Sequence, residues 1–192
     1  MEEILINYLS KYITITDELL LAIKESGFIK NFSKGTVLLS EGDLSNECYF
    51  ILKGCVRCYY NKDGDEKTTD FYTEEQVVIS SSYGKNKPSE HYLECVEDTV
   101  ASVGSPELEA EMYHRFPQLE SLARILGDVM MSKYQDTLAE YKIASPEERY
   151  LNLLKDRPDL MQRVPQHQIA SYLGIKPESL SRIRKRLLNK QK

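Results

Sequence analysis

Residues 165–184 read PQHQIASYLGIKPESLSRIR, and this stretch decides the fold of the C-terminal part of the chain. Two short helices pack at a steep angle only where their crossing point carries a small side chain and the turn admits a left-handed residue. Ala170 meets the first need, Gly174 meets the second, and Pro177 suits the first turn of a second helix. Apolar residues stand where such a pair needs a core: Ile169, Leu173, Ile175, Leu180 and Ile183. The stretch therefore predicts a helix-turn-helix.

The second predicted helix carries three polar residues near its N-terminal end, the end that enters the major groove of DNA in this motif. Glu178, Ser181 and Arg182 are spaced i, i+3 and i+4, so they share one face. Arginine can bond guanine, glutamate can accept from cytosine N4, and serine can donate or accept. We expect these three side chains to read bases. The alternative for Glu178 is an acid that interacts with the helix dipole.

Polar and basic neighbours of these residues are expected to contact phosphates. They are His167, Lys176, Ser179, Arg184, Lys185 and Arg186. The charge distribution agrees, because residues 164–192 hold seven basic residues and one acid, a net +6, which leaves −11 on the other residues of a chain whose total is −5. An acidic body with a basic end favours binding to a polyanion through that end. The alternative is a solvated charged tail.

Length and composition set wider limits. A chain of 192 residues that is 41% apolar and 29% charged forms one or two globular domains and is not disordered. No apolar run approaches the roughly 20 residues that cross a bilayer, and Met1-Glu2-Glu3 places acid where a secretory peptide carries base. Four cysteines without paired spacing indicate a reducing compartment. We expect a soluble, cytoplasmic protein with no membrane partner.

The sequence pattern in the middle of the chain predicts β-strands. Short runs rich in β-branched and aromatic residues alternate with turn residues, about 8 to 12 residues apart, which is typical of an antiparallel barrel or sandwich. The runs are 37–39, 49–52, 56–60, 68–72, 77–79, 92–96 and 100–103. Residues 1 to about 30 read instead as helix in two pieces, with Thr16 or Asp17 as the N-cap of the second.

A long helix is predicted from Gln118 to about Ile143, some 40 Å at 1.5 Å per residue. Its apolar stripe consists of Leu119, Leu122, Leu126, Val129 and Met130, continued by Tyr134, Leu138 and Tyr141. A stripe on so long a helix favours pairing with the same helix of a second chain. The alternative is packing on the chain's own barrel.

A new unit is predicted to begin at Ser145-Pro146-Glu147-Glu148, because the serine can cap, the proline suits the first helical position and Glu148 completes a capping box. We therefore expect an α+β protein with three parts. An N-terminal antiparallel β-roll, cupin-like and flanked by helices, occupies 1–116. A dimerisation helix occupies 117–143, and a helix-turn-helix domain occupies 144–192.

The chain resembles the Crp/Fnr family of bacterial transcription regulators over nearly its full length. The resemblance rests on Gly35, Gly42-Asp43, Gly54 and Gly64 at the turns of a cyclic-nucleotide-binding-like β-roll, and on the long helix and helix-turn-helix that follow. Residues 178–182 look like the E-x-x-S-R recognition motif of the Fnr branch. The resemblance implies a homodimer that binds double-stranded DNA at an inverted repeat, recruits or blocks RNA polymerase, and responds to a small-molecule effector.

Two departures limit this inheritance. The cyclic-nucleotide binders of the family close their phosphate cassette with Pro-Arg, where this chain has Pro88-Ser89, and Glu90 would repel an anion. We expect an effector pocket near Glu75, Ser80, Ser81, Ser82 and Ser89 that does not bind cyclic AMP tightly, with Lys85 and Lys87 as an alternative anion site. The second departure is a C-terminus too short for the β-wing that commonly follows the recognition helix.

Other constellations indicate no catalytic chemistry. Cys55 and Cys58 would point to opposite faces of a strand, so we expect buried thiols and not a metal site. The serine run 80–82 lacks the nucleophile elbow G-x-S-x-G, and no Walker loop or H-E-x-x-H is present. We expect no enzyme activity, no metal and no cofactor. The alternative to a DNA-binding regulator is a ligand-sensing or protein-binding module without specific DNA binding.

Overall fold

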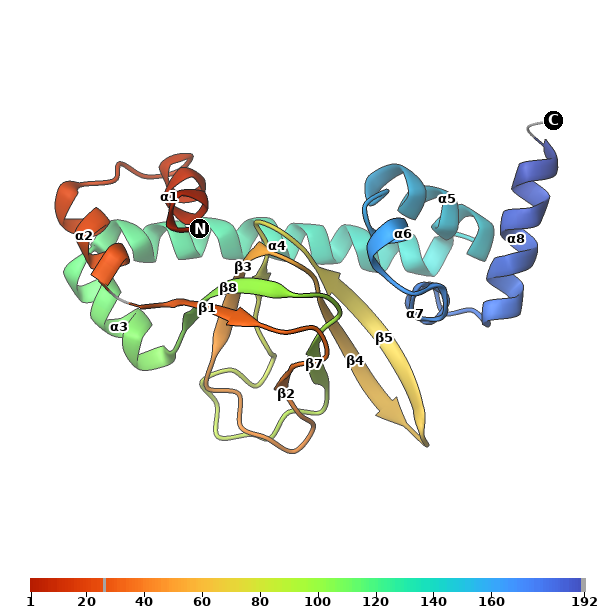
Figure 1. Ribbon diagram of the computed structural model, residues 1–192, viewed down its shortest axis with the longest axis horizontal. Coiled ribbons are helices and arrows are strands. Elements are labelled where there is room, and N and C mark those ends of the chain that lie inside the picture. The colour runs from red at the N-terminus through yellow and green to blue at the C-terminus, as the bar shows by residue number, and fades with distance from the viewer. Residues whose placement is uncertain (26, 191–192) are drawn as a thin grey trace. The chain divides into compact units, whose positions relative to one another are not determined.

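The computed structural model describes residues 1–25 and 27–190 (Figure 1). Gln191 and Lys192, the last residues of the predicted DNA-binding segment, lie outside the described residues. The chain divides into two compact units. The first consists of Met1–Cys58 and Phe71–Met131, and the second of Tyr59–Asp70 and Ser132–Lys192.

Eight strands form two four-stranded antiparallel sheets, as the α+β prediction requires. One sheet has the order β1-β8-β3-β6 and the other β2-β7-β4-β5. The strands are β1 (Ile29–Phe32), β2 (Val37–Leu39), β3 (Cys48–Lys53), β4 (Val56–Lys62), β5 (Asp65–Tyr72), β6 (Val77–Val78), β7 (Tyr92–Cys95) and β8 (Thr99–Gly104). Each of the seven predicted runs contains a strand. Strand β1 was not predicted, and its first residues lie where the helical pattern had been expected to continue to about residue 30, whereas α2 ends at Glu25.

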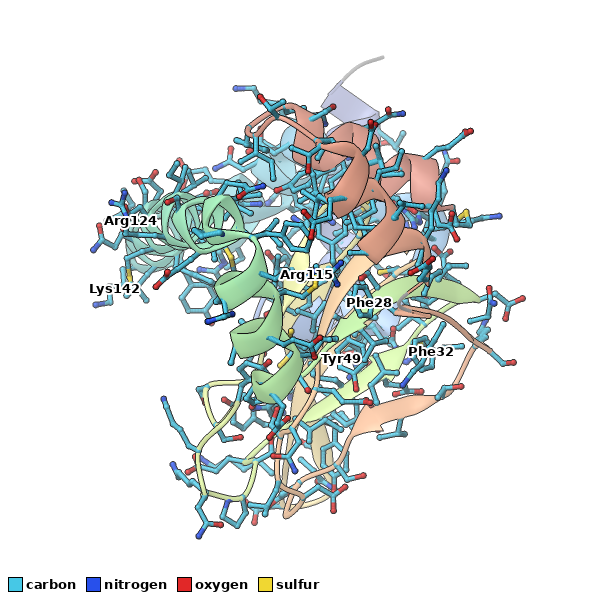
Figure 2. The ribbon with its side chains drawn as sticks, turned by 90° about the vertical axis from the view of Figure 1, so that its left-hand side faces the viewer. Phe28, Phe32, Tyr49, Arg115, Arg124 and Lys142 are labelled. Carbon is cyan, nitrogen blue, oxygen red and sulfur yellow. The ribbon has the colours of Figure 1, made fainter. Side chains whose placement is uncertain are left out.

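The core between the sheets is built from alternate residues of the strands, since successive side chains of a strand point to opposite faces. Its buried members are Leu39, Tyr49, Ile51, Val56, Cys58, Val78, Leu93, Cys95, Ala101 and Val103. Phe32 packs against this cluster with its ring edge-on to Tyr49, 6.0 Å between centroids (both labelled in Figure 2). The alternation explains why short β-branched runs were recognisable from the sequence.

A second cluster lies under the N-terminal helices α1 (Glu2–Ser10) and α2 (Asp17–Glu25). Leu5, Leu19, Ala22, Ile23, Leu52 and Phe116 are buried together there. The Thr16 hydroxyl accepts a hydrogen bond from the Leu19 backbone N–H at 3.2 Å, so Thr16 is the cap of α2, as one of the two predicted candidates. The helices thus cover a face of the strand region at Leu52.

Helix α3 (Pro106–Arg115) was not predicted. The sequence does contain a helix-start signal for it at Ser105-Pro106. In the structure Ser105 caps the helix by accepting a hydrogen bond from Leu108 N–H, and Pro106 takes the first helical position. Helix α4 (Pro117–Ile143) matches the predicted long helix. None of the helices in the described part of the chain combines the length and the apolar character needed to cross a bilayer.

The second unit ends in four helices, α5 (Pro146–Asp156), α6 (Leu160–Arg163), α7 (Gln166–Tyr172) and α8 (Pro177–Lys190). The predicted capping box is confirmed: Glu148 N–H donates to the Ser145 hydroxyl, and Ser145 N–H donates to the Glu148 carboxylate at 2.8 Å. The same unit contains the hairpin turn between β4 and β5, where Asp63 and Gly64 both have positive φ, 56° and 84°. Glycine there supplies the left-handed backbone of a tight turn.

Candidate nucleic-acid interface

Helices α7 and α8 form the predicted helix-turn-helix. Ala170 is fully buried at the crossing, and Gly174 in the turn has φ +67°. Four of the predicted core residues, Ile169, Leu173, Leu180 and Ile183, are buried, while Ile175 is half-buried. Helix α8 packs against this core through Leu180 and Ile183, so the other face of α8 is exposed to solvent.

The exposed face of α8 carries a polar stripe. Glu178, Arg182, Lys185 and Asn189 follow a 4-3-4 spacing and are all exposed, as is Ser181 beside them. Arg182, Lys185, Arg186 and Asn189 line a wide, open hollow on this helix. The structure therefore brings the three predicted base-reading residues to one solvent-facing surface. Asn189 was missed, although the helical spacing would have included it.

Two of the predicted phosphate contacts on α8 also interact with other residues of the second unit. Arg186 forms an ion pair with Glu147 of α5. Arg184 stands two residues after Arg182, on the other side of the helix, where it lines a small cavity of about 100 Å³ with Tyr150 and Leu154. Arg184 is itself exposed, so it is accessible for the predicted phosphate contact.

The other predicted phosphate contacts lie around the N-terminal ends of the two helices. His167 is exposed in the first turn of α7, and Lys176 is exposed just before α8. Ser179 is half-buried, and its backbone N–H donates to the Lys176 carbonyl at 2.9 Å. These positions flank the N-terminal end of α8, which is predicted to read bases and where a helix N-terminus favours a phosphate.

The β4–β5 hairpin contacts the helix-turn-helix within the second unit. The Ser171 hydroxyl on α7 accepts a hydrogen bond from Thr68 N–H at 2.9 Å and donates to the Glu66 carbonyl at 3.0 Å. A single side chain therefore satisfies two backbone groups of the hairpin. Sequence reasoning missed this contact, because the partners lie 103 and 105 residues from Ser171.

The residues predicted for an effector pocket are divided by the structure. Ser80 and Ser82 are buried with their hydroxyl oxygens 2.9 Å apart, and buried Ser89 donates to the His91 carbonyl at 2.9 Å. Ser81 and Glu75 are exposed, and the Glu75 carboxylate accepts from Lys11 Nζ at 2.6 Å. Glu75 therefore faces the segment after α1 and does not join the buried serines.

The charged groups of the 85–90 loop are paired with groups of that same loop or of the adjoining segment. Lys87 Nζ lies 2.7 Å from Glu90 Oε1, and this hydrogen bond holds the pKa of Glu90 below its usual range. Lys85 Nζ donates to the Ser81 carbonyl at 2.8 Å. Both lysines of the alternative anion site thus already have a partner.

The cysteines are free, and Cys55, Cys58 and Cys95 are buried, as expected for the first two. Cys48 is half-buried, and its Sγ donates to Glu109 Oε1 at 3.3 Å. Burial raises the pKa of the Cys48 thiol to about 11. This thiol is therefore protonated, and a weak nucleophile, at neutral pH.

The predicted dimerisation stripe on α4 is covered unevenly by its own chain. Leu122 is 3% exposed and Leu119 packs against the N-terminal cluster, whereas Leu126 and Met130 are half-buried and Val129 is 60% exposed. Further apolar side chains are exposed along the helix: Ile125, Met131, Tyr134, Leu138, Tyr141 and Ile143. The uncovered apolar surface thus lies mainly beyond Leu122.

Comparison with known proteins identifies the class of the strand region first. Residues 29–107 match the family described as "Cyclic nucleotide-binding domain". A comparison with curated proteins finds no match. Solved structures of Crp/Fnr family regulators then extend the similarity beyond the strand region.

FixK2 from Bradyrhizobium japonicum is 18% identical, with 85% of each chain covered and a TM-score of 0.68. The c-di-GMP responsive global regulator CLP from Xanthomonas campestris is 18% identical, with 85% of this chain and 87% of that chain covered and a TM-score of 0.64. The catabolite activator protein of Thermus thermophilus is 18% identical, with 98% and 84% covered and a TM-score of 0.51. The chain has the Crp/Fnr fold, and the resemblance recognised in the sequence is thereby confirmed for the fold.

Proposed function

We propose that the protein is a sequence-specific DNA-binding transcription regulator of the Crp/Fnr type, which binds an inverted repeat as a homodimer. The observation that carries the proposal is the exposed polar face of α8, held outward by a buried helix-turn-helix core. Glu178, Ser181 and Arg182 occupy its N-terminal end, where base edges are read. Lys176, His167 and Lys185 flank that end and supply phosphate contacts.

The dimer places two such helices about one DNA turn apart, roughly 34 Å. The exposed apolar surface of α4 supports pairing with a second copy, because an isolated chain would leave it in water. In this proposal residues 1–116 form the effector domain, 117–143 the dimerisation helix and 144–192 the DNA-binding domain. RNA polymerase is the partner on which the bound dimer acts.

An effector would act by binding one arrangement of the dimer more tightly than another. Cyclic AMP does not suit the chain, because Ser89 is buried and hydrogen-bonded where an arginine would clamp the phosphate. The ion pair with Glu90 compensates the positive charge of Lys87 toward an incoming phosphate.

The test begins with duplexes enriched from a random-sequence library by the full-length protein. We expect one inverted-repeat sequence, and an affinity for it that falls steeply between low and moderate salt. Arg182→Ala should weaken binding to this duplex by about 1–3 kcal/mol and relax the preference at one base position of each half-site. Fluorescence anisotropy with duplexes mutated at single positions measures both effects.

Lys185→Ala is the matched control, since it removes a charge from the same face and should weaken all duplexes alike. Equal losses by the Arg182→Ala variant on the selected duplex and on a scrambled one would exclude base reading by Arg182. Enrichment of no sequence, together with weak binding that is the same for every duplex, would contradict the proposed function and favour a ligand-sensing or protein-binding module.

A further inference from the structure

Arg149, in the first turns of α5, joins three parts of the second unit. One terminal nitrogen, Nη1, donates to the Ala144 carbonyl at 3.0 Å and to the Tyr141 carbonyl at 3.3 Å. The other, Nη2, donates to the Leu173 carbonyl at 3.0 Å. Buried Nε has no hydrogen-bond acceptor among the described residues. The guanidinium thus links the C-terminal end of α4, its own helix and the turn of the helix-turn-helix.

The electrostatics of these bonds are favourable at both ends. Tyr141 and Ala144 lie at the C-terminal end of α4, and Leu173 is the C-cap of α7. The last carbonyls of a helix lack partners within the helix and carry partial negative charge. One cation therefore satisfies the carboxyl ends of two helices, which lysine, with a single ammonium, cannot reproduce in the same planar geometry.

Tyr141 completes the contact. The Arg149 guanidinium lies over its ring at 4.6 Å from the centroid, a cation–π distance. The Tyr141 hydroxyl lies against the turn: a Cβ on Gly174 would stand 2.5 Å from that oxygen. Gly174 is thus required for its φ of +67° and also for the approach of Tyr141. Ring, guanidinium and turn form one packed group.

The consequence concerns α8. Only Ala144 and Ser145 separate α4 from α5, so the direction of the following helices depends on contacts across this short connection. Leu173 and the neighbouring Ile169 are buried in the core that packs α7 on α8. Holding the Leu173 carbonyl therefore holds the recognition helix.

We propose that Arg149 is a positioning residue that fixes the orientation of α8 relative to the C-terminal part of α4. Its use in setting the spacing of half-sites rests on the proposed function, but the orientation itself does not. An Arg149→Met variant keeps the length of the apolar stem and loses all three hydrogen bonds and the cation–π contact. We expect its recognition helix to sample a range of orientations.

The experiment measures the distance distribution between spin labels at positions 135 and 189, both on exposed residues of the second unit. Cys48 is replaced by serine, and labelled protein is diluted in an excess of unlabelled protein so that only distances within one chain are observed. We expect a single narrow peak for the parent chain, a distribution at least twice as wide for Arg149→Met, and an intermediate width for Arg149→Lys. Lys155→Met, an exposed residue of the same helix, should leave the peak unchanged.

A second readout uses the duplex selected by the parent protein and the same duplex with one base pair inserted between half-sites. The parent should lose at least tenfold in affinity on the insertion, and Arg149→Met should bind both duplexes within a factor of three. An unchanged distance distribution for Arg149→Met would overturn the proposal. A parent chain that selects no duplex would contradict the proposed function and leave the distance result to decide the role of Arg149. If Arg149→Met does not fold, Tyr141→Leu and Arg149→Lys must broaden the same peak for the proposal to stand.

Discussion

At Gly54, the lack of a side chain allows a close approach to the backbone of residues 98 and 99. This glycine has φ +109°, and a Cβ there would stand 2.6 Å from the Thr99 Cα and 2.8 Å from the Asp98 carbonyl oxygen. Gly54→Ala must therefore displace backbone and adopt a strained φ, so we expect a loss of about 2–4 kcal/mol in unfolding free energy. Denaturation followed by circular dichroism measures this loss.

Gly64→Ala is the control for that substitution. Its φ is +84°, but no atom lies within 4 Å of the added methyl group, so only the backbone strain remains. We expect a loss of about 1 kcal/mol. Equal losses at the two glycines would show that the close approach at Thr99 has no energetic weight.

Single residues also show which contacts the sequence could predict. Ala170 and Gly174 were recognisable because the helix-turn-helix is local, and its constraints fall within twenty residues. Arg149 was not, because its acceptor at Leu173 is 24 residues away and nothing in the spacing indicates that pair. Ser171 and its hairpin partners are further apart still. The placement of Glu178, Ser181 and Arg182 on one exposed face could be predicted, whereas the non-local contacts of Arg149 and Ser171 could not.

At the scale of elements, the contribution of the capping box at the start of α5 to the unfolding free energy can be measured. Ser145→Ala removes the acceptor for Glu148 N–H and should cost the second unit about 1 kcal/mol. Glu148→Gln keeps the length of the reciprocal partner but removes its charge. Both variants are compared with the parent by chemical denaturation across a range of pH.

The pH dependence of that effect has a defined sign. The hydrogen bonds with Ser145 lower the pKa of Glu148 below its ordinary value of 4.5. A folded-state pKa below the unfolded one contributes stability above the unfolded pKa, and this contribution is lost as pH falls through the folded value. The parent should therefore exceed Glu148→Gln in stability at pH 7 and converge with it at a pH below the folded-state pKa of Glu148. A constant difference down to that pH would contradict a charged capping interaction.

Helices and strands were predicted correctly where the sequence carried a strong local pattern. Seven strands followed from β-branched and aromatic runs between turn residues, and α4 followed from helical spacing. Capping chemistry predicted the cap at Ser145 and offered Thr16 as one of two candidates. Helix α3 was missed although Ser105-Pro106 resembles Ser145-Pro146, because no apolar stripe follows it: none of its residues is buried. The helix lacks the burial pattern on which helix prediction relies.

At the scale of the whole molecule, the proposed function assigns the exposed part of α4 to the contact between two copies. Val129 is 60% exposed and Leu138 is 55% exposed. Because these side chains are already partly covered, their full burial against a second copy would stabilise the dimer by about 1–1.5 kcal/mol each. In the proposed function each chain supplies one recognition helix, so loss of the dimer would also remove one of the two half-site contacts.

We therefore expect the parent chain to sediment at twice its 22.2 kDa and Val129→Lys to sediment as a monomer. Leu151→Lys on α5, which places the same charge on another exposed apolar residue, should remain dimeric. Val129→Lys should bind the selected duplex with only the affinity of a single half-site, since the second helix-turn-helix is no longer tethered. A parent that sediments at 22.2 kDa, or a Val129→Lys variant that stays dimeric, would exclude this part of α4 as the contact between copies.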